Sequence, residues 1–126
     1  MSARKNLKIL VVDDFSATRT ILINQLSNLG YSNTVVSEDG FSALARLKSS
    51  LFDLVVTDLS MSDMSGLDLL KKIRTDSELK HIPVLMITSE DLQENIVTAI
   101  KAGLNDYIIR PFEAVSYTHL TLPTKA

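Results

Sequence analysis

Two kinds of apolar segment alternate along the chain. Short runs rich in Val and Ile occur at positions 7–12, 34–36, 54–57, 84–87 and 107–109. Runs this short, apolar and β-branched are typical of strands that are buried on both faces, as in a parallel sheet. The pattern therefore predicts five buried strands.

The longer segments between these runs have helical spacing. In the first, Leu22, Leu26 and Leu29 share one face, and Gly30 follows as a natural helix-ending residue. The other three centre on residues 43–47, 69–73 and 96–103. Strands that alternate with helices imply right-handed crossovers and a doubly wound α/β sheet.

The last residues break this alternation where a fifth helix is expected. Residues 115–126 are β-branched, carry Pro123 and have no amphipathic stripe. Residues 115–124 also resemble the translation of a transposon adapter used to build shotgun DNA libraries. We therefore expect one domain over residues 1–113, truncated before its last helix, and a non-native segment over residues 114–126. The alternative is a native C-terminal extension.

Composition narrows the functional classes. The chain has 126 residues, which suits one domain, and its net charge of −2 leaves no basic excess for nucleic acid or an anionic membrane. With no Cys, disulfide scaffolds and thiolate metal sites are excluded. No apolar run approaches the length of a membrane span, and residues 1–6 lack the apolar core expected of a signal peptide. The expected location is the cytoplasm.

Chemically active side chains follow the predicted strands. Asp13 and Asp14 follow the first strand, Asp58 the third, Thr88 the fourth and Arg110 the fifth. In an open α/β sheet, ligands bind beyond the carboxyl ends of the strands. Grouped carboxylates suit Mg²⁺, and a carboxylate beside the ion can attack a phosphoryl group. A hydroxyl and a cation would bind the other phosphoryl oxygens. The pattern predicts a metal-assisted phosphoryl acceptor.

Each of these residues also has a purely structural interpretation. Asp13 and Asp14 could cap the following helix, and Asp58 could be a turn residue. Thr88 could begin a helix, and Arg110 could simply end a strand. Their joint occurrence at strand ends favours the site.

Four segments carry a family resemblance, at residues 10–16, 56–61, 84–90 and 105–112. Over residues 6 to about 113 the chain resembles the receiver domain of two-component response regulators, most closely the single-domain chemotaxis members. The resemblance implies a flavodoxin-like fold with five parallel strands in the order 2-1-3-4-5.

The resemblance also implies roles for individual residues. Asp58 would be the phosphoryl acceptor. Asp13 and Asp14 would hold Mg²⁺ together with Asp58 and the backbone carbonyl of Ser60. These assignments match the chemistry that the strand ends suggest.

Five further positions match or depart from the family pattern. By resemblance, Thr88 would bind a phosphoryl oxygen and Tyr107 would be the aromatic switch. Arg110 stands where the family has a Lys, which keeps the charge but not the shape. The bond to Pro111 is the candidate for a cis peptide. Ser62 replaces the family's usual Pro, which should loosen the loop after Asp58.

The resemblance implies partners as well. A sensor histidine kinase would donate the phosphoryl group, and a downstream protein would read the change, the flagellar motor switch in the chemotaxis case. This domain itself would contact neither nucleic acid nor membrane. A single acceptor without an evident general acid predicts a protein that is not an enzyme. Two alternatives stay open: a receiver module of a larger protein, and a phosphorylation-independent pseudo-receiver scaffold.

Overall fold

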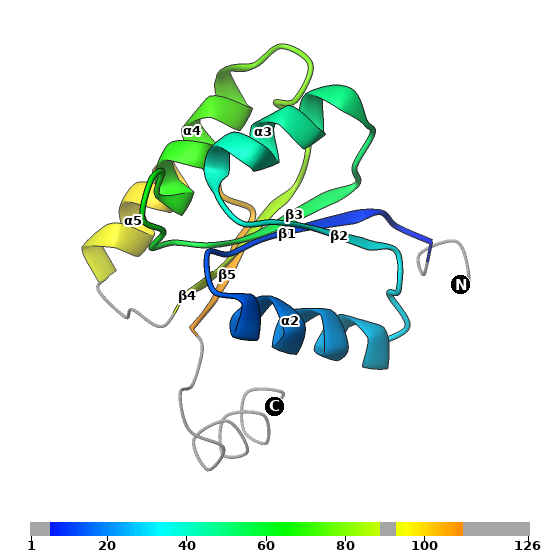
Figure 1. Ribbon diagram of the computed structural model, residues 1–126. Coiled ribbons are helices and arrows are strands. Elements are labelled where there is room, and N and C mark those ends of the chain that lie inside the picture. Colours follow the sequence, from blue (N-terminus) through cyan, green and yellow to red (C-terminus); the bar gives the residue numbers. More distant parts are fainter. Residues whose placement is uncertain (1–5, 89–92, 110–126) are drawn as a thin grey trace.

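The computed structural model describes residues 6–88 and 93–109, in which five strands form one parallel sheet (Figure 1). The sheet order is β2-β1-β3-β4-β5, which confirms the predicted fold class. The strands are β1 (Ile9–Val12), β2 (Thr34–Ser37), β3 (Leu54–Asp58), β4 (Val84–Thr88) and β5 (Asp106–Ile109). The five predicted runs therefore all form strands.

The strand ends differ slightly from the apolar runs. The first run begins at Leu7, whereas β1 begins at Ile9. The Lys8 amide donates to the Asp53 side chain at 2.8 Å, so it is bonded outside the strand ladder. At the other end of the sheet, β3 extends by one residue to include Asp58.

Four helices connect the strands. They are α2 (Ser16–Asn28), α3 (Gly40–Ser49), α4 (Gly66–Thr75) and α5 (Gln93–Lys101). Gly30 and Gly103 follow α2 and α5 with φ of 99° and 106°, as their role at helix ends requires. None of the helices in the described ranges has the length and hydrophobicity needed to cross a membrane.

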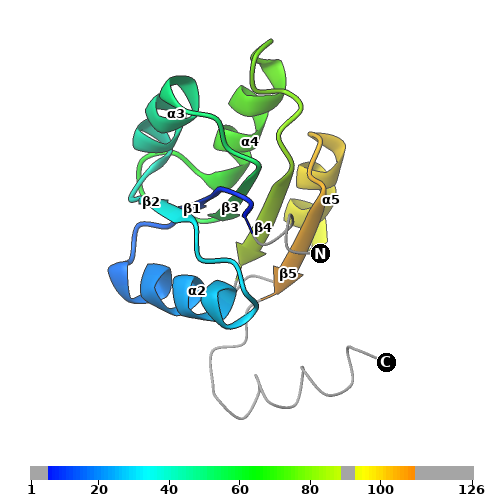
Figure 2. The ribbon, with the colours of Figure 1, turned by 90° about the vertical axis from the view of Figure 1, so that its right-hand side faces the viewer.

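The helices lie unequally on the two faces of the sheet. Figures 1 and 2 show α3, α4 and α5 on one face and α2 on the other. The larger core, under α3, α4 and α5, includes the fully buried Leu69, Leu70 and Ile73. The smaller core lies between α2 and the sheet and centres on Ile9, Val11, Leu22 and Val56. The prediction of a missing fifth helix concerns residues outside the described ranges and stays a prediction.

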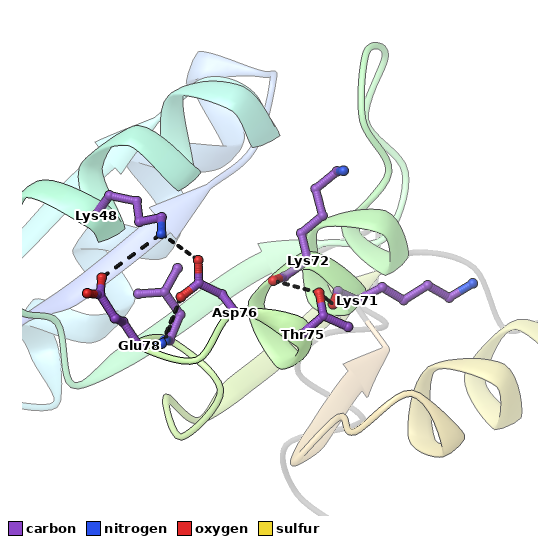
Figure 3. Close-up of polar contacts among 7 residues, drawn as sticks. Lys48, Lys71, Lys72, Thr75, Asp76 and Glu78 are labelled. Atoms are coloured by element: carbon purple, nitrogen blue, oxygen red, sulfur yellow. Dashed lines mark hydrogen bonds and ion pairs between the residues drawn. The ribbon is translucent and has the colours of Figure 1, made fainter.

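An ion pair joins α3 to the segment after α4 (Figure 3). Lys48 Nζ lies 2.6 Å from Asp76 Oδ2 and 4.0 Å from Glu78 Oε1. Asp76 also accepts from the Glu78 amide at 2.8 Å. The Lys48 hydrogen bond lowers the pKa of Asp76, and the same bond raises the pKa of Lys48. The pair links α3 to the C-terminal end of α4, and both helices cover the same face of the sheet.

Candidate functional site

The candidate site lies at the carboxyl ends of β1 and β3. These strands are hydrogen-bonded neighbours, with Val12 paired to Thr57. Asp13 follows Val12, and Asp58 follows Thr57, so the two residues come side by side in register. Both are buried, with exposed fractions of 0% for Asp13 and 8% for Asp58. Two neighbouring buried carboxylates are costly unless charge or hydrogen bonds compensate them.

Asp13 is held by the turn that leads into α2. Its Oδ1 accepts from the Phe15 amide at 2.9 Å, and its backbone carbonyl accepts from Arg19 Nη1 at 2.6 Å. The N-cap residue of α2 is Phe15, whose side chain makes no capping bond. Asp13 therefore takes part in the turn before α2, although neither Asp13 nor Asp14 is the N-cap residue of that helix. Sequence reasoning assigned no role to Arg19, because its contact is with a backbone atom.

Asp14 reaches across to the loop after β3. Its Oδ2 accepts from the Ser62 amide at 3.0 Å. Its other oxygen, Oδ1, is buried and has no hydrogen-bond partner among the described residues. A buried carboxylate oxygen of this kind is an acceptor suited to a cation.

Gly66 packs directly against the backbone of Asp58. A Cβ at this position would lie 2.0 Å from the Asp58 carbonyl oxygen, so only glycine fits. The Gly66 amide also donates to the Leu59 carbonyl at 2.7 Å. Ser60, the predicted carbonyl ligand, is an exposed residue of the loop that this bond closes. The close approach fixes the chain on the C-terminal side of the proposed acceptor.

The remaining predicted site residues lie on β4 and β5. Asp58 pairs with Ile87, which places Thr88 one residue further along β4. Thr88 in turn pairs with Ile109 at the end of β5. Tyr107 lies on β5 opposite Met86 and is 37% exposed. The register thus brings Thr88 to the same end of the sheet as Asp13 and Asp58. Arg110 and the cis candidate Pro111 lie outside the described residues.

The acidic residues lie at one end of the sheet, but their side chains are not arranged around a common metal position. Within residues 6–88 and 93–109, no three His, Asp or Glu side chains form a group that could hold a metal ion. Asp13 and Asp14 each direct one oxygen to a backbone amide, of Phe15 and Ser62. The donor set nevertheless fits Mg²⁺, because the unpartnered Asp14 Oδ1 and the buried Asp13 and Asp58 are hard oxygen donors.

Comparison with known proteins identifies the family. The model of the response regulator receiver domain matches residues 9–120. The chain belongs to the response regulator receiver family. The resemblance noted in the sequence is thereby confirmed. The receiver chain is 55% identical to the chemotaxis protein CheY-3 of Vibrio cholerae over 112 residues, which cover 89% of this chain and 86% of the relative.

Solved receiver structures share the fold. Chemotaxis protein CheY4 of Vibrio cholerae superposes with a TM-score of 0.78 at 28% identity, over 92% of this chain and 96% of that chain. Response regulator TrrA of Thermotoga maritima, solved in complex with Mg²⁺-BeF, gives 0.74 at 27% identity, over 91% and 96% of the two chains.

Proposed function

We propose that this receiver domain is a phosphoacceptor response regulator in which Asp58 takes a phosphoryl group from a histidine kinase. The observation that carries the proposal is the pair of buried carboxylates, Asp13 and Asp58, at the carboxyl ends of adjacent parallel strands. Family membership supplies the class of reaction. The position of Asp58 at the carboxyl end of β3, the central strand of the sheet, supports its role as the acceptor.

The reaction is a transfer between two nucleophiles. An Asp58 carboxylate oxygen forms a bond to phosphorus, while the bond from phosphorus to the imidazole nitrogen of a phosphohistidine breaks. The electron pair stays on the leaving imidazole. Asp13, Asp14, Asp58 and the Ser60 carbonyl would hold Mg²⁺, which offsets charge on the phosphoryl oxygens when bound.

The remaining residues would convert the modification into a change of surface. Thr88 would donate to a phosphoryl oxygen, and Arg110 would pair with the group as a cation. Tyr107 would repack as Thr88 moves. The nearby surface of α5 and β5 carries exposed apolar side chains, Val97, Ile100 and Ile108, which suits a protein partner. Phosphorylation would thus shift the equilibrium between two conformations of the domain by adding local charge.

The proposed output is chemotaxis signalling through a protein partner, with the flagellar motor switch as candidate. The 55% sequence identity to CheY-3, over most of both chains, supports this output. We further propose that the domain works in the cytoplasm, contacts neither nucleic acid nor membrane, and is not an enzyme in its own right. A receiver module of a larger protein is the second candidate, and a pseudo-receiver scaffold is the third.

The test is phosphorylation by a small acyl phosphate in the presence of Mg²⁺, followed by intact-mass spectrometry. Wild type should gain one phosphoryl group, and a chelator should abolish the gain. Asp58→Asn should gain none, whereas Asp68→Asn, at an exposed position of α4, should react like wild type. Phosphorylation of Asp58→Asn at the wild-type rate would refute the acceptor assignment, and an unreactive wild type would favour the scaffold.

A further inference from the structure

One hydrogen bond joins the two loops that border the site. The Ser62 backbone amide donates to Asp14 Oδ2 at 3.0 Å, between residues that are 48 positions apart. Asp14 lies after β1, and Ser62 lies between β3 and α4. The bond therefore joins the segment after β1 to the loop after β3.

The bond divides the Asp14 carboxylate into two unlike oxygens. Oδ2 is occupied by the amide, while Oδ1 is buried without a hydrogen-bond partner in the described part of the chain. A carboxylate held in this way presents one oxygen rather than two. Mg²⁺ requires near-octahedral geometry and suits ligands that each supply one fixed oxygen.

We infer that the Ser62 amide is a positioning donor for Mg²⁺ binding, because it holds Asp14 so that Oδ1 is left for the ion. The inference rests on the proposed function, in which Asp14 is a metal ligand. Outer hydrogen bonds to a ligating carboxylate orient it, and their loss commonly weakens metal binding by a factor of 10 to 100. Ser62 is exposed, so water competes for its amide, and the expected effect lies at the lower end of this range.

The inference concerns the backbone amide and not the hydroxyl of Ser62. Proline is the substitution that removes the amide hydrogen. No described non-glycine residue has a positive φ, so proline at this position does not conflict with the sign of φ. Alanine and glycine keep the amide, and glycine also loosens the loop. The three variants separate the hydrogen bond from the hydroxyl and from the stiffness of the loop.

The experiment is a Mg²⁺ titration of the full chain by isothermal calorimetry. Ser62→Pro should raise the Mg²⁺ dissociation constant about tenfold. Ser62→Ala should match wild type, and Ser62→Gly should stay close to it. A Ser62→Pro variant that binds Mg²⁺ as tightly as wild type would overturn the inference, as would an Ser62→Ala variant weakened to the same extent.

A second measurement does not depend on the folding of the proline variant. The inference requires the bond to persist in the metal-bound state, so Mg²⁺ should slow hydrogen exchange of the Ser62 amide in the wild-type chain. Unchanged or faster exchange would contradict the positioning role of this amide. Failure of the proposed function is distinguishable, because a wild type that binds no Mg²⁺ refutes the metal step itself. Wild type that binds the ion while Ser62→Pro binds it equally well refutes only the positioning role.

Discussion

Arg74, near the end of α4, makes several hydrogen bonds to backbone and side-chain oxygens outside its own helix. Its Nε donates to the Gly103 carbonyl at 2.9 Å, its Nη1 to the Ile82 carbonyl at 2.7 Å, and its Nη2 to Asn105 Oδ1 at 2.7 Å. Asn105 Oδ1 also accepts from the Val84 amide at 2.8 Å. The guanidinium thus ties α4 to the starts of β4 and β5. We expect Arg74→Met to destabilise the fold substantially.

The magnitude follows from three short bonds to a charged donor. A hydrogen bond to a charged group contributes about 1.5–3 kcal/mol, but neighbouring bonds are not additive. Burial lowers the pKa of Arg74, which indicates that desolvation of the guanidinium offsets part of the gain. Water also competes at this half-buried position. We therefore expect a loss of about 2–3 kcal/mol, or roughly 10 °C in Tm for a domain of this size.

The assay is urea unfolding followed by far-ultraviolet circular dichroism. Arg74→Lys should fall between wild type and Arg74→Met, because one ammonium cannot span the three acceptors. Arg46→Met is the matched control, since Arg46 is exposed on α3, and it should stay within about 0.5 kcal/mol of wild type. An Arg74→Met variant as stable as the Arg46→Met control would refute the reasoning.

Two further predictions concern close packing and charge. Gly66→Ala would place a Cβ 2.0 Å from the Asp58 carbonyl oxygen and should cost about 3 kcal/mol as well as slow phosphorylation. Gly40→Ala is the comparison for reactivity, because that Cβ would crowd the buried Met64 side chain and not the acceptor loop. It should lose stability but be phosphorylated like wild type, and an equal loss of reactivity in both variants would contradict the argument. Lys48→Met should lower Tm at neutral pH through loss of the Asp76 ion pair. Because the pair lowers the pKa of Asp76, its contribution is present above the unfolded-state pKa and is lost as pH falls through the lower folded-state pKa. The Tm difference should vanish in acid, and a difference independent of pH would contradict this.

The sheet and the order of its elements could be predicted from the sequence for a physical reason. Parallel strands buried on both faces require continuous β-branched runs, and these runs are visible at residues 54–57 and 84–87. Once the strands are parallel, their carboxyl ends share one edge, so Asp13, Asp58 and Thr88 come to the same end of the sheet without further information.

The contacts that shape the site could not be predicted in the same way. The bond between Ser62 and Asp14 is made by a backbone amide, which every residue except proline carries. Gly66 begins α4, but its approach to the Asp58 carbonyl depends on how α4 leaves the loop. The three distant acceptors of Arg74 are likewise set by tertiary packing. Such contacts leave no periodic pattern in the sequence.

The pairing of β1 with β3 has a consequence for folding. Ile9 pairs with Leu54, which is 45 positions further along the sequence, and β2 and two helices lie between them in the chain. Closing a loop of this length costs entropy before any contact compensates for it, so this step should come late on the folding pathway. Asp13 and Asp58 are neighbours only after it. An incompletely folded chain would therefore carry every site residue and still be unable to signal.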